Sequence, residues 1–205
     1  MSILKNICIT AALMISLPLL AQNDAALQKA FSESYTQEYN KKYNDAIATL
    51  SKVNSDANYE TNLRIGWLHY SNKNYPQSQA FYHKAVQLKP YAVEARLGLV
   101  KPLSALESWD KVLEQYEEVL KIDPQNYTAG YWAGVIHYNR KKYDAAIRLF
   151  EKLVNLYPFD YDVNHMLAWS YLNIGRSNDA RLLFNIALLS RPGDASCLAG
   201  LAKIK

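Results

Sequence analysis

Apolar residues along this chain recur at helical spacing in short segments that polar turns separate. Residues 62–73 show one such pattern, Asn74-Tyr75-Pro76 follows as a turn, and residues 77–88 show a second pattern. Pro90 is expected to end the second helix, because proline has no N–H to continue the hydrogen bonding. Pro76 suits the first turn of a helix, where the missing N–H has no partner. The pattern predicts a unit of two helices.

This unit recurs with a period of 34 residues. The repeat is visible at four sets of positions: the prolines Pro90, Pro124, Pro158 and Pro192; the aromatic residues Tyr82, Tyr116, Phe150 and Phe184; the apolar residues Ala85, Val119, Leu153 and Ala187; and the mostly small residues Gly66, Val100, Gly134 and Ala168. Another aromatic set, Tyr75, Trp109 and Tyr143, is interrupted at Ser177. We expect the small residues to allow close helix approach and the aromatic residues, Trp109 included, to be buried between helices.

The period and the order Leu/Ile-Gly, Tyr, Ala, Phe/Tyr, Ala and Pro resemble the tetratricopeptide repeat. The resemblance implies an all-α fold, a right-handed α-solenoid of about five helix-turn-helix repeats and a C-terminal half-repeat. The expected repeats are residues 27–58, 59–92, 93–126, 127–160 and 161–194, with a capping helix at 195–205. The first repeat lacks the proline stop. The third has Val100 in place of glycine, and Pro102 is expected to interrupt its first helix.

The N-terminus has the layout of a secretory signal peptide. Lys5 is its only charge, residues 7–20 are almost entirely apolar, and Ala21 offers a small residue at a cleavage point. We expect residues 1–21 to be removed, leaving residues 22–205 with a formal charge of +3 instead of +4. An uncleaved membrane anchor is the competing interpretation. The mature chain would keep one cysteine, Cys197, and so could form no internal disulfide.

The resemblance implies that first helices line a concave groove. A stripe at i, i+4 and i+7 lies beside the packing positions, such as Ile65 and Gly66, and is expected to face this groove. It is rich in aromatic residues with polar tips, which are enriched at binding surfaces. The predicted groove residues are Tyr35, Leu63, Trp67, Tyr70, Lys101, Tyr131, Val135, Tyr138, His165 and Trp169. If the register is wrong by one residue, the rings would instead thicken the interhelix core.

Two features of this stripe have alternative interpretations. Lys101 is its only cation and precedes Pro102, so a kink could direct Lys101 into the groove; alternatively, Pro102 is a tolerated break. The acidic residues Glu60, Glu94 and Asp162 could form a groove margin or simply complement helix N-termini.

The sequence gives no support for catalysis, a cofactor or a metal. His-Glu-x-x-His, a cysteine pair and a Gly-rich phosphate loop are absent from the sequence, and His69 and His137 are expected to form interhelix hydrogen bonds. Lys41-Lys42 and the basic residues 140–142 fall in turns, with no cationic stripe for nucleic acid.

We therefore expect a non-enzymatic adaptor or scaffold that is exported, periplasmic or secreted, and that binds a protein or extended peptide in its groove. The family's carboxylate clamp is not expected, because Leu63 and Trp67 replace its Lys and Asn. The alternatives are a polysaccharide-binding helper in envelope export or assembly and a purely structural spacer. An apolar C-terminal helix, with Cys197, Leu198, Leu201 and Ile204, further predicts self-association or a partner at that end.

Overall fold

A computed structural model describes residues 24–55 and 57–204, and all regular secondary structure in this part of the chain is helical. The expected signal segment, residues 1–21, lies outside the described residues. Within those residues, no helix is both long and apolar enough to cross a membrane. The chain divides into two compact units, one ending at Pro102 and the other beginning at Leu103.

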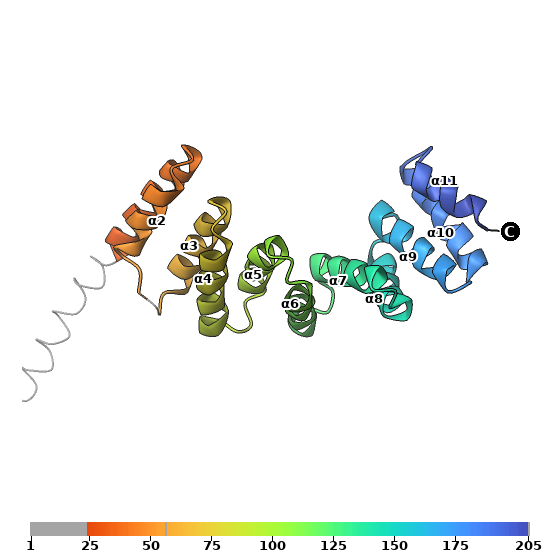
Figure 1. Ribbon diagram of the computed structural model, residues 1–205, viewed down its shortest axis with the longest axis horizontal. Coiled ribbons are helices and arrows are strands. Elements are labelled where there is room, and N and C mark those ends of the chain that lie inside the picture. Colours follow the sequence, from red (N-terminus) through yellow and green to blue (C-terminus); the bar gives the residue numbers. More distant parts are fainter. Residues whose placement is uncertain (1–23, 56, 205) are drawn as a thin grey trace, which may run out of the picture. The chain divides into compact units, whose positions relative to one another are not determined.

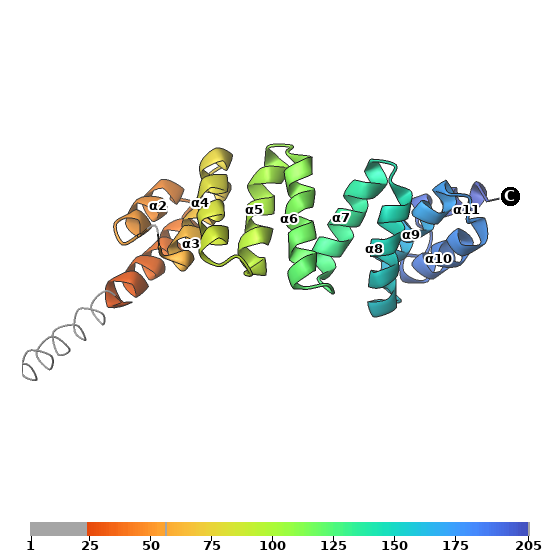
Figure 2. The ribbon, with the colours of Figure 1, turned by 90° about the horizontal axis from the view of Figure 1, so that it is seen from below.

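The first unit is a stack of helix pairs. After a helix over residues 24–39 come α2 (Tyr43–Ser51), α3 (Tyr59–Ser71), α4 (Tyr75–Leu88) and α5 (Val93–Ala105), and the boundary between the units falls within α5. Helix α3 packs against both α2 and α4, which lie beside it in Figures 1 and 2. One core cluster of the first unit contains Ala30, Ala46, Leu50, Ile65 and Leu68, all from the first helix, α2 and α3.

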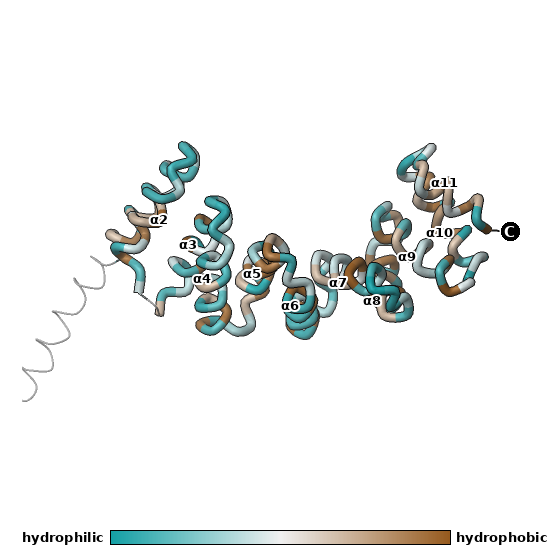
Figure 3. The backbone as a smooth tube through the Cα atoms, viewed as in Figure 1, coloured by the Kyte–Doolittle hydropathy of each residue, from teal (hydrophilic) through white to brown (hydrophobic). Residues whose placement is uncertain are grey.

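The second unit continues the same arrangement. Its helices are α6 (Trp109–Ile122), α7 (Tyr127–Asn139), α8 (Tyr143–Leu156), α9 (Tyr161–Asn173), α10 (Ser177–Ser190) and α11 (Ala195–Ala202). Each helix packs against the next, and α11 also contacts α9. Along each helix the backbone alternates between hydrophobic and hydrophilic segments, as Figure 3 shows, because one side faces neighbouring helices and the other faces solvent.

The burial of the second-helix aromatic residues is confirmed. Tyr82, Tyr116, Phe150 and Phe184 are all buried, and so are the apolar residues three positions after them. The close approach expected at small residues is also present, since a Cβ on Gly134 would lie 2.6 Å from the ring of Phe150. These buried rings hold the two helices of a unit together.

Each turn from a first to a second helix contains one residue in the left-handed region. The residues are Lys41, Lys73, Glu107 and Lys141, with φ of 59°, 60°, 54° and 58°, and Gly175 with φ of 83°. At the Lys141 turn, Lys141 donates to the carbonyl of Tyr138, and Lys142 donates to the carbonyl of His137. These bonds satisfy carbonyl groups at the helix end, and glycine is the residue that favours this conformation.

First helices from three repeats, and α11, begin with a side-chain cap. Asn58, Asn126, Asp160 and Asp194 each accept a hydrogen bond from the backbone N–H three residues later. Such a cap satisfies one of the free N–H groups of the first turn.

Two expectations about the third repeat are wrong. Helix α5 runs through Pro102 to Ala105, so the proline does not interrupt it. Trp109 is 49% exposed and not buried. The equivalent residues Tyr75 and Tyr143 contact Tyr70 and Tyr138 of the preceding helix at ring distances of 5.8 and 5.5 Å. The residue facing Trp109 by the same repeat is Ser104, which has no ring to cover it.

Candidate binding faces of the first helices

In the first unit, α3 and α5 bring three of the predicted groove residues together. Trp67 and Tyr70 lie on α3 with ring centroids 5.8 Å apart, and both are partly exposed. The ammonium of Lys101, on α5, lies 5.6 Å from the Trp67 ring and 6.0 Å from the Tyr70 ring. These distances are within the range of cation–π attraction. We call Tyr35, Leu63, Trp67, Tyr70 and Lys101 the α3 face.

A partly buried ion pair between Arg64 and Glu38 supports the α3 face. Glu38 accepts a hydrogen bond from Trp67 Nε1 at 2.5 Å through Oε1, and its Oε2 lies 2.5 Å from the Arg64 guanidinium. Arg64 is 8% exposed and also donates to Ser34 Oγ at 3.4 Å. Its guanidinium stacks 3.9 Å from the Tyr35 ring centroid. The pair therefore fixes the orientations of both Tyr35 and Trp67.

Leu63 is the one aliphatic residue of the α3 face. It is partly buried and packs against the cluster of Tyr59, Ala85 and Ala95. Tyr35, in contrast, is 56% exposed. The face thus has an exposed aromatic margin and an apolar base.

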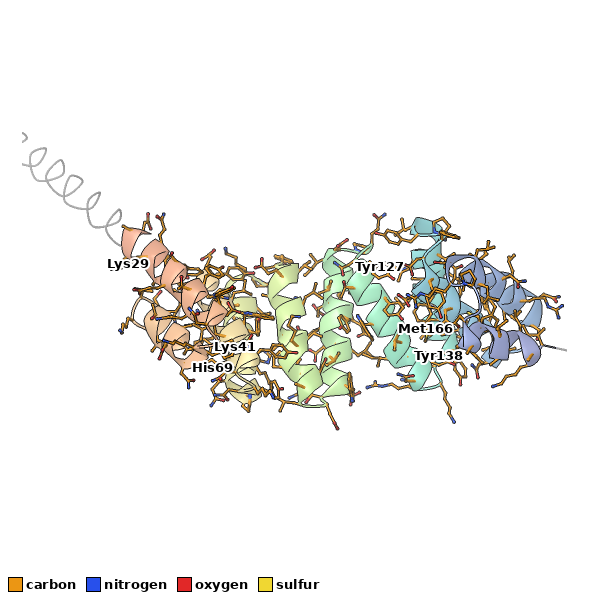
Figure 4. All side chains as sticks on the ribbon, turned by 90° about the horizontal axis from the view of Figure 1, so that it is seen from above. Lys29, Lys41, His69, Tyr127, Tyr138 and Met166 are labelled. Atoms are coloured by element: carbon orange, nitrogen blue, oxygen red, sulfur yellow. The ribbon has the colours of Figure 1, made fainter. Side chains whose placement is uncertain are left out.

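In the second unit, the predicted residues lie on α7 and α9, and all of them are partly exposed. Tyr131, Val135 and Tyr138 follow one side of α7, whose two ends are marked by Tyr127 and Tyr138 in Figure 4. Tyr127 stacks on Tyr131 with centroids 6.0 Å apart. The Tyr138 hydroxyl accepts a hydrogen bond from Asn173 of α9 at 3.2 Å. We call Tyr131, Val135, Tyr138, His165 and Trp169 the α7–α9 face.

Trp169 links this face to the last helix. Its indole N–H lies 3.1 Å from both His165 Nε2 and Ser196 Oγ, and His165 Nε2 is 2.8 Å from the same hydroxyl. The Trp169 ring meets Phe184 edge-on at 5.3 Å, and the Lys203 ammonium lies 5.1 Å from it. The N–H of Trp169 is thus used inside the protein, and a ligand would contact the part of its ring that remains exposed.

The aromatic hydroxyls of the α7–α9 face are neutral donors. Partial burial raises the pKa of Tyr131 and of Tyr138 above the ordinary value. Burial likewise lowers the pKa of His165, so its imidazole is neutral near pH 7. A ligand on this face would therefore meet rings with uncharged polar tips.

The two histidines that were expected to form interhelix hydrogen bonds, His69 and His137, do not form them among the described residues. His69 stacks on Phe81 at 5.4 Å, and its buried Nδ1 has no hydrogen-bond partner among the described residues, so that expectation is wrong for His69. The expectation is wrong for His137 too, because its buried Nδ1 has no hydrogen-bond partner among the described residues and its Nε2 lies 4.0 Å from the Glu117 carboxylate of α6, too far for a hydrogen bond. Neither histidine belongs to the two faces.

Several supporting residues were not predicted from the sequence. Arg64, which donates to Ser34, stacks on Tyr35, and Ser196 accepts from Trp169, but the periodic groove stripe includes none of these three supporting residues. One signal existed for Arg64, because a cation in an otherwise apolar packing stripe requires a buried acid nearby. Arg140, expected in a solvated turn, pairs with Asp110 at 2.8 Å.

The fold defines a class of protein, a stack of helix pairs whose first helices carry partly exposed rings. Family models described as tetratricopeptide repeat match residues 59–91, 92–161 and 137–204. The chain belongs to the tetratricopeptide repeat family, which confirms the resemblance seen in the sequence.

Individual relatives share the repeat and the fold. A TPR repeat-containing protein of Methanocaldococcus jannaschii is 34% identical over an alignment of 86 residues, with a coverage of 38% of this chain and 15% of that protein. A crystal structure of a tetratricopeptide repeat protein from Parabacteroides merdae gives a TM-score of 0.74 at 16% identity, covering 87% of this chain and 72% of that one. A crystal structure of MamA protein gives 0.71 at 18% identity, covering 83% and 94%. These identities support a common fold alone.

Proposed function

We propose that this protein is an exported adaptor that binds a protein or an extended peptide on the α3 face and the α7–α9 face. The observation that carries this proposal is the partial exposure of all ten predicted groove residues, most of which are aromatic or histidine. Rings with a polar tip can be desolvated by a partner while their hydrogen bonds persist. Binding energy would be spread over several shallow contacts, as is usual for repeat proteins.

Site-specific photo-crosslinking tests the binding faces. A benzophenone amino acid would replace Tyr70 or Tyr138 and, as a control, the exposed Gln77 or Glu114 on second helices. We expect one partner band from the two face positions and none from the controls. Equal crosslinking at the control positions would contradict the proposal.

A polysaccharide is the second candidate, because sugars also stack on partly exposed Trp and Tyr rings such as Trp67 and Tyr131. Tryptophan fluorescence can be titrated with oligosaccharides and with the crosslinked partner's peptides. Saturable quenching by oligosaccharides, with no response to the peptides, would show that the ligand is a glycan and not a protein.

The proposed export is supported by the signal-like sequence of residues 1–21 and is tested separately. We expect mass spectrometry of the protein from the producing cell to show a chain that begins at Gln22. An intact N-terminus in salt-washed membranes would instead indicate an anchor.

We also propose contact with a partner or a second copy at α11. Leu198 is 49% exposed, whereas Cys197 is buried. Light scattering over a concentration series should show self-association that Leu198→Lys weakens. A monomer at every concentration would exclude the second copy.

A further inference from the structure

Three side chains with metal-binding atoms meet where α11 packs against α9. His165 lies on α9, Asp194 is the N-cap of α11, and Cys197 lies in the first turn of α11. One nitrogen, one oxygen and one sulfur atom from these residues lie within 4.8 Å of one another. His165 and Asp194 are partly exposed, so an ion could reach the cluster from solvent, while Cys197 forms its buried base.

The preceding repeat provides an internal comparison for this cluster. The residues 34 positions earlier are Tyr131, Asp160 and Val163. Asp160 caps α9 by accepting from the Val163 N–H at 2.9 Å, just as Asp194 accepts from the Cys197 N–H at 2.8 Å. The backbone arrangement is therefore shared by both places.

The stacking of rings is shared as well, but the chemistry differs. Tyr127 stacks on Tyr131 with planes 6° apart, and Tyr161 stacks on His165 with planes 15° apart. At the last repeat a histidine thus stands where a tyrosine stacks, and a cysteine stands where a fully buried valine packs. Packing and capping do not require His165 or Cys197, because the preceding repeat has the same packing and the same cap with Tyr131 and Val163.

Neighbouring groups already hold the three side chains in place. Trp169 and Ser196 are in hydrogen-bond contact with the His165 ring, and the Tyr161 hydroxyl bonds to Asp194. Outer hydrogen bonds of this kind orient metal ligands and adjust their basicity. Burial and a hydrogen bond to Asp194 raise the pKa of the Cys197 thiol to about 11, so the metal-free thiol keeps its proton near pH 7.

We propose that His165, Asp194 and Cys197 form a three-ligand site for Zn²⁺ or a chemically similar transition-metal ion. Imidazole, carboxylate and thiolate are the usual protein ligands of zinc. The ion forms a metal–sulfur bond in place of the S–H bond of Cys197, and the proton passes to solvent. Water or a group from a partner takes the fourth tetrahedral position. The ion ties the short helix α11 to α9 and stabilises the C-terminal end.

Cobalt titration of the full chain, first freed of metal with a chelator, tests the site. Co²⁺ bound by a thiolate gives a sulfur-to-cobalt charge-transfer band in the near ultraviolet and intense visible bands in tetrahedral geometry. We expect these bands to saturate at one ion per chain and to disappear when Zn²⁺ is added. Zn²⁺ should also raise the melting temperature.

The preceding repeats supply matched variants that preserve the fold. Cys197→Val copies Val163, Asp194→Asn copies the cap Asn126, and His165→Tyr copies Tyr131. We expect Cys197→Val to lose the charge-transfer band and the other two to weaken Co²⁺ binding at least ~10-fold, the scale of a disturbed metal site. His137→Gln, outside the cluster, should bind as the unchanged chain does.

Either of two results would overturn the proposal, provided that circular dichroism shows the variants to be folded. One is the absence of a thiolate–cobalt band at saturating Co²⁺. The other is Cys197→Val binding Co²⁺ as tightly, and gaining as much thermal stability from Zn²⁺, as the unchanged chain.

Discussion

The ring of Tyr82 occupies the space that a Cβ on Gly98 would need. The same ring packs against Gly66 of its own repeat, where an added Cβ would lie 3.0 Å from it. Tyr82 on α4 is thus held between glycines of α3 and α5. This contact explains why glycine stands at position 98.

Gly98→Ala should therefore destabilise the protein. Overpacking a core costs about 1–3 kcal/mol. Because the new Cβ would overlap the buried ring of Tyr82, we expect a cost near the upper end of this range, above the ~1 kcal/mol that alanine gains over glycine in a helix. Gly130→Ala is the matched control, because its Cβ would meet Leu153 at an ordinary 3.4 Å. Urea unfolding should show a loss for Gly98→Ala and a gain of up to ~1 kcal/mol for Gly130→Ala. A gain at both positions would disprove the tight contact.

Truncation of Trp67, Trp109 and Trp169 to alanine should separate two environments. Trp109 is half exposed, so its loss should change the free energy of unfolding by less than ~0.5 kcal/mol. Trp67 and Trp169 each pack against a core cluster and donate an indole hydrogen bond, so we expect losses of roughly 1–3 kcal/mol, below the value for a fully buried ring. Both should also weaken partner binding by ~2 kcal/mol. A loss at Trp109 equal to that at Trp169 would contradict this assignment.

Lys141→Gly should stabilise the protein. Lys141 has φ of 58°, a conformation that costs a non-glycine residue about 1 kcal/mol, and Gly175 occupies the equivalent turn. The neighbouring Lys142 has φ of −86°, so Lys142→Gly should bring no gain. Gly175→Ala should lower the free energy of unfolding by about 1 kcal/mol, because it places a non-glycine residue in the left-handed region. Thermal unfolding of the three variants measures these differences, and equal effects at 141 and 142 would refute them.

His69 should make the first unit sensitive to acid. Burial lowers the pKa of His69 in the folded chain below its ordinary value near 6.5, so the unfolded chain binds the proton more readily. The stability associated with a neutral His69 is thus fully present above about pH 6.5 and decreases as the pH falls through that value toward the folded pKa. His69→Phe keeps a ring against Phe81 and should reduce the loss of stability between about pH 7.5 and about pH 5.

Urea midpoints at the two pH values give this comparison. His137, whose pKa burial also lowers, accounts for part of the slope that remains in His69→Phe. An unchanged slope in the variant would show that His69 titrates equally in the folded and unfolded chains.

The sequence by itself determined the repeat, the pairing of helices and the burial of rings such as Tyr82 and Phe150. It could do so because the contacts that build a repeat are local, and the same spacing therefore returns every 34 residues. It also placed Trp67 and Trp169 on a partly exposed side, since helical periodicity alone assigns residues to faces.

Only the tertiary structure decided what each exposed or half-buried side chain meets. Trp109 is uncovered because the facing residue is Ser104, and Arg64 is neutralised because Glu38 lies on the preceding repeat's first helix. His165, Asp194 and Cys197 meet because α11 packs on α9. Periodicity fixes the face on which a residue lies. Contacts such as these depend in addition on the direction in which a long side chain extends across two packed helices. That extension depends on rotamers and neighbours about thirty residues away, which a spacing pattern does not contain.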